Sequence, residues 1–220
     1  MSLNKYSGKD TVLKKYIDEI DYSIVKRGKG FELYQRFFDI LLSLLGIIVG
    51  APLLLIFGIL IKLEDGGPIT YKQERLGRYG REFYVYKLRS MRTDAEKFGA
   101  QWAEKDDPRI TKVGKFIRKT RIDEIPQLWN ILNGDMGIIG PRPERSVFTK
   151  EFEEKYPNFV YRLAIKPGLT GLAQVNGGYE MDPGEKLEYD LYYIKNRSVV
   201  LDIKIILKTV RVVFTGDGAR

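Results

Sequence analysis

An acidic pair, Asp123-Glu124, begins a run with the pattern of a helix and is the strongest candidate for chemistry in the sequence. Asp123 can cap this helix, Pro126 suits its first turn, and Gly134 can end it. Adjacent carboxylates at a helix start more often serve as caps that compensate the helix dipole. The cations that precede the pair are Arg118, Lys119 and Arg121. We therefore expect the pair to stay ionised and phosphate groups to be drawn to it.

Two further clusters offer cations that could bind phosphate. In the segment 140–145, prolines on both sides of Arg142 hold its backbone extended, which limits the entropy lost when the guanidinium binds a phosphate. In the segment 86–92, strand alternation would place Lys87 and Arg89 on one face. Each cluster also has a purely structural interpretation, as a stiff turn and as a solvated basic edge strand.

The missing residue types narrow the chemistry. The 220 residues include no cysteine and no histidine, which excludes disulfides, thiolate and imidazole metal sites, thiol nucleophiles and histidine-based triads. Catalysis must therefore use carboxylate, hydroxyl, amine or phenol groups. A bound metal would have oxygen ligands, which favours a hard cation such as Mg²⁺. The net charge of +8 predicts an acidic partner, and nucleic acid, anionic lipid and phosphorylated small molecules all meet that condition.

One long apolar run must place this site relative to a membrane. From Ile40 to Ile61 the chain has 22 residues without a formal charge, enough for one helix to cross a hydrocarbon core of about 30 Å. Pro52 lies at the middle of the run and removes a backbone hydrogen bond, so we expect two short helical halves. A plain transmembrane anchor is the simpler interpretation.

The charges on both flanks favour a hairpin over that anchor. Lysine and arginine are abundant before the run, in residues 26–36, and after it, in residues 62–81. A full span would carry one of these clusters across the membrane, against the tendency of basic residues to stay on the cytoplasmic side. A hairpin avoids this conflict, since each half of about ten residues reaches about halfway through the bilayer and returns to the same face. A cleaved signal peptide is not expected so deep in the chain.

The remaining pattern predicts a mixed α/β, mostly helical protein in three parts. Residues 1–30 form an amphipathic lead-in, residues 31–63 the membrane hairpin, and residues 64–220 a catalytic domain. Within that domain, residues 69–71 and 82–86 alternate like short strands, whereas residues 93–102 and 113–119 have helical patterns. Residues 199–214 have the pattern of an interface helix, with an ordinary core-facing helix as the alternative. The apolar stripe in residues 12–20 is a surface helix or only part of the lead-in.

Several ordered motifs carry a resemblance to one protein family, which extends from about Arg36 to Phe214 and so covers most of the chain. The motifs are Asp107-Pro108-Arg109-Ile110-Thr111, Arg118-Lys119-Thr120-Arg121-Ile122-Asp123-Glu124-Ile125-Pro126-Gln127-Leu128-Trp129-Asn130, Gly134-Asp135-Met136, Gly140-Pro141-Arg142-Pro143, Lys166-Pro167-Gly168-Leu169-Thr170-Gly171 and Gln174-Val175-Asn176-Gly177. In this order they are highly specific. The chain resembles the bacterial sugar transferases, which are monotopic polyprenyl-phosphate phosphoglycosyl transferases.

The resemblance implies an active site at a membrane. A re-entrant helix hairpin with a break near Pro52 would seat the catalytic domain on the cytoplasmic face of a bacterial inner membrane. Relatives often have Ser-Pro at the break where this chain has Ala51-Pro52, which puts one hydrogen bond at the kink in doubt. By the same resemblance Asp123 is the nucleophile, Glu124 is its neighbour, and both are associated with Mg²⁺. The family positions tied to phosphate binding are Lys87, Arg118 and Arg142, and the further substrate-binding candidates are Arg89, Arg109, Arg145, Gln174 and Asn176.

The implied reaction has two steps. The Asp123 carboxylate attacks the sugar-bearing phosphorus of a UDP-sugar, UMP leaves, and undecaprenyl phosphate then attacks the covalent phosphosugar intermediate. An aspartate with the ordinary pKa of about 3.9 needs no external base, because it is already ionised at neutral pH. The segments 99–102 and 177–193 resemble the hexose-1-phosphate branch used in exopolysaccharide or capsule assembly, which favours glucose or galactose and leaves deoxy-diamino and N-acetyl sugars open. Nucleic acid is then not an expected partner, and a homodimer is compatible with the sequence.

Two alternatives predict different behaviour. A non-enzymatic, membrane-anchored module that binds anionic lipid or nucleic acid would need only interchangeable surface cations and not Asp123. A direct transfer would use Asp123 only to position Mg²⁺ and would form no covalent intermediate. Trapping a modified Asp123 distinguishes the two-step reaction from both.

Overall fold

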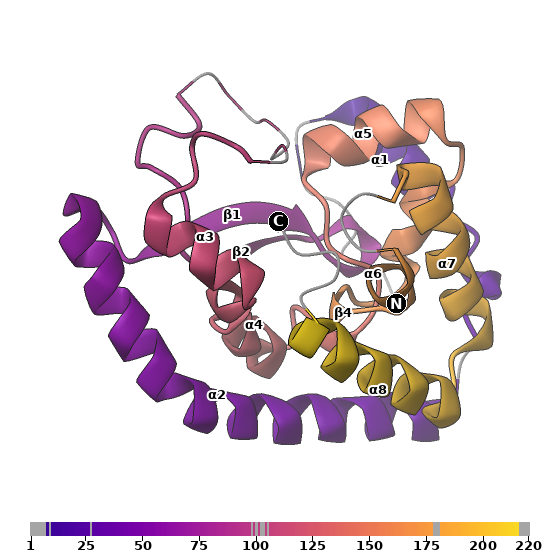
Figure 1. Cartoon of the computed structure of the whole chain (residues 1–220). Helices are drawn as coiled ribbons and strands as arrows, with labels where there is room; N and C mark the ends of the chain where they lie inside the picture. Colours follow the sequence, from indigo (N-terminus) through magenta and orange to yellow (C-terminus); the bar gives the residue numbers. More distant parts are fainter. Residues whose placement is uncertain are drawn as a thin grey trace.

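The computed structural model describes residues 8, 10–26, 28–97, 99, 101, 104, 106–177 and 181–215, and it shows a mostly helical protein with two small sheets (Figure 1). The elements in chain order are α1 (Thr11–Asp18), η1 (Tyr22–Ile24), α2 (Lys29–Asp65), β1 (Thr70–Leu76), η2 (Arg78–Gly80), β2 (Glu82–Leu88), α3 (Lys112–Lys119), η3 (Ile122–Glu124), α4 (Gln127–Asn133), β3 (Gly137–Ile139), α5 (Ser146–Lys155), η4 (Phe159–Ala164), β4 (Gly168–Thr170), α6 (Leu172–Asn176), α7 (Pro183–Asn196) and α8 (Val199–Thr215), where η marks a short 3-10 helix. The predicted mixed class with a helical majority is confirmed.

Helix α2 is the longest of these elements, and it runs uninterrupted through Pro52. The expected break near Pro52 is therefore wrong, and the two expected halves are joined in one continuous helix. Proline removes one backbone hydrogen bond, but the turns on either side continue, so the helix bends instead of breaking. Figure 1 shows α2 passing beneath the other elements and then turning upward in its C-terminal part. The re-entrant course of this helix through one leaflet stays a prediction.

The apolar side chains of α2 are largely uncovered. Within the part of the chain that the structure describes, Gly30–Asp65 is the one stretch of helix long and apolar enough to cross a membrane, and only 17% of its most apolar window is buried. Val49 and Leu63 have exposed fractions of 73% and 77%. Because so large an apolar surface is unfavourable in water, α2 indicates that the protein associates with a membrane.

The structure has two pairs of strands. The first pair confirms the predicted strand segments, and the second was not predicted. β1 and β2 form an antiparallel hairpin in which Tyr71 lies opposite Lys87. β3 and β4 pair in parallel, with Gly137 opposite Gly168. The second pair brings together chain segments about thirty residues apart, and β3 is followed directly by the segment of Arg142.

Helix α4 lies between the hairpin and α2 (Figure 1). Its Leu128 and Ile131 pack with Phe83 and Val85 of β2 in one buried cluster. On its other side, Arg36 of α2 donates two hydrogen bonds of 2.7 Å to the Ile131 and Leu132 carbonyl groups, in the last turn of α4, where carbonyls lack the full set of partners inside the helix. α4 is therefore fixed between the strand hairpin and α2.

The two predicted interface segments bury their apolar residues to different degrees. Leu13 and Ile17 of α1 are fully buried in a core cluster with residues of η4, so the apolar stripe of the lead-in packs on the rest of the fold. Helix α8 buries Ile205 but exposes Val200 and Leu207. Of these two helices, α8 is the one that retains an apolar face for a membrane to cover.

One of the two predicted domain helices is present. Residues 112–119 form α3, which confirms the second helical pattern. Residues 93–97 form turns instead of the first predicted helix, and residues 98, 100 and 102 lie outside the described residues. Helix nucleation is unfavourable, and a short segment gains only a few backbone hydrogen bonds in return. Tertiary contacts therefore easily override a weak helical pattern.

Candidate active site

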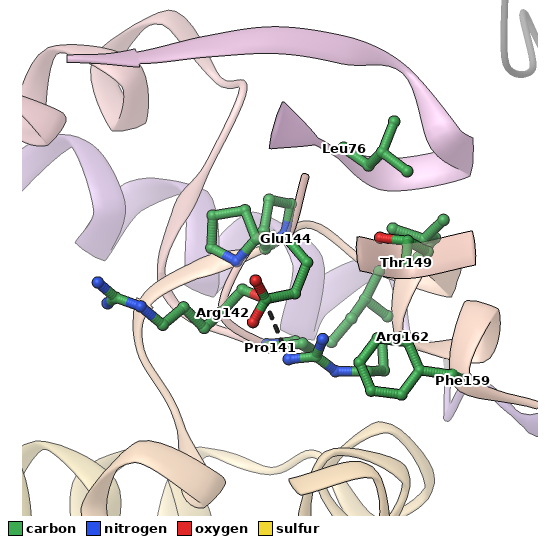
Figure 2. Close-up of a pocket in the computed structure, with 11 residues that line it drawn as sticks. Leu76, Pro141, Arg142, Glu144, Thr149, Phe159 and Arg162 are labelled. Atoms are coloured by element: carbon green, nitrogen blue, oxygen red, sulfur yellow. Dashed lines mark hydrogen bonds between the residues drawn. The ribbon is translucent and has the colours of Figure 1, made fainter. Parts of the chain in front are cut away.

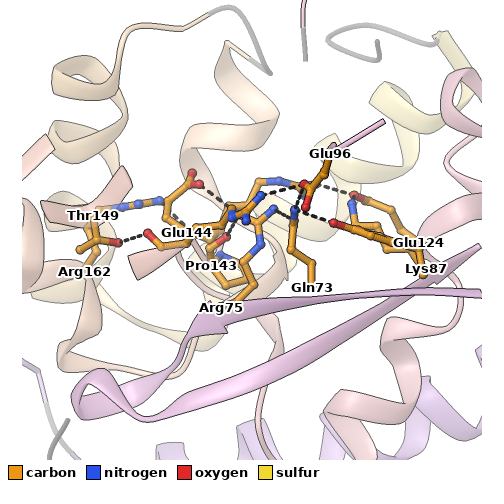
Figure 3. A network of polar contacts seen from close by, with 12 residues as sticks. Gln73, Arg75, Lys87, Glu96, Glu124, Pro143, Glu144, Thr149 and Arg162 are labelled. Carbon is orange, nitrogen blue, oxygen red and sulfur yellow. Dashed lines mark hydrogen bonds and ion pairs between the residues drawn. The ribbon is translucent and has the colours of Figure 1, made fainter. Parts of the chain in front are cut away.

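Two cations from different elements meet on the carboxylate of Glu124. Its Oε1 accepts a hydrogen bond of 2.8 Å from Lys87 Nζ and a second, short one from the guanidinium of Arg142. The Glu124 side chain is only 12% exposed. Figure 3 shows Lys87 and Glu124 facing each other within a larger polar network. The structure thus brings together three of the residues predicted from the sequence.

Asn130 of α4 holds this arrangement together. The side chain is almost fully buried, its Nδ2 donates a 2.7 Å hydrogen bond to the carbonyl of Tyr84, and its Oδ1 accepts a 3.2 Å hydrogen bond from the amide of Tyr86. These contacts fix the backbone of β2 immediately before Lys87. Asn130 therefore sets the spacing between the helix that follows the acidic pair and the strand that carries the lysine.

Asp123 lies in η3, beside Glu124, with a side chain that is 6% exposed. The expected capping role is wrong: η3 begins after Arg121, α4 begins after Pro126, and neither start has a side-chain cap. No hydrogen bond to the Asp123 carboxylate is found among the described residues. Gly134 does end α4, as predicted, in the left-handed region with φ 87°. The nucleophile candidate is thus not occupied as a helix cap.

Burial and charge move the pKa values of the acidic pair apart. Burial raises the pKa of Asp123 to about 6, Lys87 opposes this rise, and the charge of Glu124 adds to it. Burial would also raise the pKa of Glu124, but Arg142 and Lys87 together hold it well below its usual range. Glu124 is therefore a fixed anion, whereas Asp123 titrates close to neutrality. The expectation of an ordinary aspartate pKa for Asp123 is wrong.

Arg118 at the end of α3 also acts on Asp123. Its charge lowers the pKa of the Asp123 carboxyl, as does that of Arg142. Among the described residues, the Arg118 guanidinium has neither a hydrogen bond nor an ion pair. It is thus the cation of this group that remains free to bind an anionic ligand.

Arg89, by contrast, is placed away from this group although strand alternation puts it on the face of Lys87. β2 ends at Leu88, and Arg89 is buried in an ion pair with Asp65 at the end of α2. Its Nε also donates a 2.6 Å hydrogen bond to the carbonyl of Pro68. These contacts assign Arg89 the structural task of joining α2 to the strand hairpin.

We predict that Arg89→Met weakens folding without weakening donor binding. Loss of the guanidinium removes the donor to the Pro68 carbonyl and leaves Asp65 with only the Gly67 amide among the described residues. This should cost about 1–2 kcal/mol and lower the midpoint of thermal unfolding by roughly 2–6 °C. The KM for the sugar donor should stay within about twofold of the wild type. Lys87→Met is the matched variant and should raise that KM instead; a comparable rise for Arg89→Met would show that the structural assignment is mistaken.

The other predicted binding residues have partners of their own. Arg109 pairs with Asp107 at 2.6 Å, and Arg145 pairs with Glu96 at 2.8 Å. The two amide candidates, Gln174 and Asn176, each donate a hydrogen bond to a backbone carbonyl of the segment 169–172. Their proposed contacts with substrate stay predictions. The segments compared with the hexose-1-phosphate branch include residues 100, 102 and 178–180, which lie outside the described residues.

The acidic pair has the donor chemistry that Mg²⁺ prefers. Mg²⁺ is commonly held by one or two carboxylates together with phosphate oxygens of a substrate. Asp123 has no hydrogen-bonded partner among the described residues, and only one oxygen of Glu124 accepts hydrogen bonds from Lys87 and Arg142. Within the described chain no group of three or more acidic side chains gathers to form a complete metal cage. Asp123 and Glu124 therefore fit an Mg²⁺ ion whose remaining ligands include oxygens of a bound diphosphate.

Sequence reasoning did not assign roles to Asn130 and to the buried ion pair of Arg162 with Asp190. Asn130 is the last residue of the longest motif, and this placement was the sequence signal for its role. Arg162 and Asp190 lie outside every motif, and their partnership depends on how α7 packs against η4.

The chain is similar to known proteins over most of its length. The family model for bacterial sugar transferases matches residues 31–216. The chain is 46% identical over 202 residues to the UDP-N-acetylgalactosamine-undecaprenyl-phosphate N-acetylgalactosaminephosphotransferase of Aeromonas hydrophila, covering 90% of this chain and 46% of the relative. It is 39% identical over 215 residues to the undecaprenyl-phosphate galactose phosphotransferase of Salmonella typhimurium, covering 91% and 44%. It is 40% identical over 183 residues to the UDP-glucose:undecaprenyl-phosphate glucose-1-phosphate transferase of Klebsiella pneumoniae, covering 81% and 39%.

The chain spans less than half the length of each of these three relatives. The family match, however, extends over most of this chain and includes α2 from residue 31 onward, the acidic pair, the segment of Arg142 and α8. The resemblance carried by the sequence motifs is therefore confirmed, and the chain belongs to the bacterial sugar transferase family.

Proposed function

We propose that this protein transfers a sugar-1-phosphate from a UDP-sugar to undecaprenyl phosphate and releases UMP. The observation that supports this most directly is the buried acidic pair faced by Lys87, Arg118 and Arg142. Such a cluster can hold a diphosphate and a carboxylate together, which in water would repel each other. The family match and the printed activities of the three relatives support the same reaction.

The chemistry proceeds in two displacements at one phosphorus atom. An oxygen of Asp123 forms a bond to the sugar-bearing phosphorus, the bond from that phosphorus to the bridging oxygen breaks, and UMP departs with that oxygen and the electron pair. A phosphate oxygen of undecaprenyl phosphate then bonds to the same phosphorus, and the Asp123 carboxylate leaves. Asp123 needs no proton acceptor in the first step as long as it is ionised.

The cations around the pair offset the charge of the reactants. Arg118 has no ion pair among the described residues and is suited to the incoming diphosphate, whereas Lys87 and Arg142 can turn from Glu124 toward the transferring phosphoryl group. Mg²⁺ held by Asp123 and Glu124 would supply further charge stabilisation to the diphosphate. Glu124 keeps both basic side chains aimed at the site before substrate arrives.

The sugar is proposed as a hexose or an N-acetylhexosamine. The sequence favours glucose or galactose, and relatives at 39–40% identity are named for these sugars. A relative at 46% identity is named for N-acetylgalactosamine, so this sugar belongs in any donor panel. A role in the first membrane step of exopolysaccharide or capsule assembly follows if the acceptor is undecaprenyl phosphate.

The membrane arrangement is proposed from exposed apolar surface. The bent helix α2 would enter and leave one leaflet from the cytoplasmic side of the inner membrane, and the exposed face of α8 would lie at the interface. This places the acidic pair near the headgroups, where the phosphate of a polyprenyl lipid lies. A homodimer is compatible with this arrangement.

The test is intact-protein mass spectrometry with Mg²⁺ and UDP-glucose, UDP-galactose, UDP-N-acetylglucosamine or UDP-N-acetylgalactosamine, without acceptor. One donor should add the mass of its sugar phosphate, and undecaprenyl phosphate should remove that mass. UMP release that begins only after undecaprenyl phosphate is added, with no adduct beforehand, would favour direct transfer. No adduct with any donor, together with no UMP release after undecaprenyl phosphate is added, would count against the enzyme and favour the membrane-anchored module that binds anionic lipid or nucleic acid.

We predict that the rate of adduct formation decreases as the pH falls below about 6. Only the ionised Asp123 carboxylate can attack, and burial raises the pKa of Asp123 to about 6. When the Mg²⁺ concentration is limiting, the rate of adduct formation should therefore fall about tenfold for each pH unit below that value. Single-turnover rates between pH 5 and 8, measured without acceptor, exclude titration of the acceptor phosphate. Rates that stay flat down to pH 5 would contradict the raised pKa.

A further inference from the structure

Four consecutive carbonyl groups fix the segment that carries Arg142. Pro141 and Pro143 lack an amide hydrogen, so this segment can be held mainly through its carbonyls. The hydrogen bonds run from Gly168 N to Pro141 O at 2.9 Å, from Arg162 Nη2 to Arg142 O at 3.0 Å, from Arg75 Nη1 to Pro143 O at 3.0 Å, and from Leu76 N to Glu144 O at 2.9 Å. Every carbonyl from residue 141 to residue 144 therefore has a donor from another part of the chain.

Arg162 is the donor to Arg142 itself. Its side chain is 5% exposed, its Nε donates a 2.6 Å hydrogen bond to Asp190 of α7, and its guanidinium lies 4.7 Å from the ring centroid of Phe159. Figure 2 shows Arg162 beneath the segment, bonded to it, while the guanidinium of Arg142 extends away from this contact. The planar guanidinium thus joins one carboxylate to one backbone carbonyl in a fixed geometry.

Stability alone is a weak explanation for this buried pair. Removing two charges from water costs about as much as their attraction returns, and apolar residues of similar volume often stabilise a protein equally well. An apolar pair could not donate to the Arg142 carbonyl, however. The hydrogen bond to that carbonyl is therefore the feature that the charged pair uniquely supplies.

We propose that Arg162, oriented by Asp190, is a positioning residue for Arg142. It fixes the backbone from which the Arg142 side chain reaches Glu124 and, under the proposed function on which this inference rests, the transferring phosphoryl group. Arg162 touches no reacting atom and acts through the Arg142 carbonyl. The relevant precision is below one ångström, since a misplacement of about 1 Å can cost about a hundredfold in rate.

The variant that tests this is Arg162→Met combined with Asp190→Leu, which removes the donor without leaving an unpaired charge. We expect kcat/KM for UMP release to fall about 10- to 100-fold while thermal unfolding changes little. The matched control is Arg197→Met, because Arg197 is also buried, donates to a backbone carbonyl, that of Lys26, and lies over an aromatic ring. The control should keep kcat/KM within about twofold of the wild type.

A double-mutant cycle with Arg142→Met separates positioning from a general structural effect. If Arg162 acts through Arg142, replacing the pair should change kcat/KM by less than about twofold once the Arg142 side chain is gone. Losses that multiply in the combined variant would overturn the proposal, as would a folded pair variant with unchanged kcat/KM.

A second readout needs no substrate. Hydrogen exchange of the Gly168 and Leu76 amides, which bond to Pro141 and Glu144 on either side of Arg142, should be at least about tenfold faster in the pair variant. If the pair variant does not fold, Arg162→Lys replaces it. Lysine keeps a charge beside Asp190 but lacks the planar guanidinium, so this variant should show smaller changes in kcat/KM and hydrogen exchange in the same direction. If the wild-type protein has no activity, the proposed function fails. Unchanged hydrogen exchange of the Gly168 and Leu76 amides in the pair variant would overturn the positioning of Arg142 whether or not the protein is active.

Discussion

Asp123→Asn should abolish adduct formation and reduce UMP release by at least about 10³-fold. The amide oxygen of asparagine is a poor nucleophile and carries no charge, so the first displacement loses its attacking group. The variant should form no phosphosugar adduct with the donor that modifies the wild type. Single-turnover mass spectrometry and UMP release measure the two effects on the same samples.

The same variant should be more stable than the wild type at pH 7. Burial raises the pKa of Asp123 to about 6, which means that the folded state binds the proton more tightly than the unfolded state. Stability therefore falls as the pH rises from about 4 through 6, by about 1–3 kcal/mol. A neutral asparagine avoids this cost, so the catalytic loss would not result from unfolding. The exposed ion-paired residue Asp106 provides the control, and Asp106→Asn should change neither activity nor stability measurably.

A different result would change the mechanism. Asp123→Asn with UMP release within about tenfold of the wild type would exclude Asp123 as nucleophile and favour direct transfer on a metal. A less stable variant at pH 7 would show instead that the ionised carboxylate is held favourably by Lys87, Arg118 and Arg142, and that its pKa is not raised.

Local pattern was enough to predict the parts of the site that depend on short segments. The proline-flanked Arg142, the glycine that ends α4 and the strand that carries Lys87 all have their reason within a few neighbouring residues. The acidic pair was also found this way, although its capping role was wrong. Its adjacency to Arg118 and Lys119 along the chain predicted an electropositive setting, and the structure places Arg118 close enough to affect the pKa of Asp123.

Long-range packing decided what the sequence pattern could not. Lys87 and Arg89 are two residues apart and alike in charge, yet one meets Glu124 and the other meets Asp65 at the end of α2. The course of α2 through Pro52 depends on neighbouring turns that continue after one hydrogen bond is lost. The raised pKa of Asp123 depends on burial, which no motif encodes.

Glu124→Gln should lower kcat/KM by about 10²–10³-fold and also move the acidic limb of the pH profile. Glutamine cannot hold Mg²⁺ as a carboxylate does, and Lys87 and Arg142 lose the anion that aims both of them at the site. The charge of Glu124 raises the pKa of Asp123, so its removal should lower that pKa and shift the loss of adduct formation to a pH below 6.

The shift distinguishes an electrostatic role of Glu124 from a merely structural one. Glu153→Gln is the control, since Glu153 accepts hydrogen bonds only from backbone amides of Asn158 and Val160 among the described residues, and neither rate nor pH profile should change. A reduced rate with an unmoved limb would mean that Glu124 and Asp123 do not share one electrostatic environment. Lys87→Met in the Glu124→Gln background tests the aiming role separately. If Glu124 is what holds Lys87 at the site, the second substitution should cause little further loss of kcat/KM.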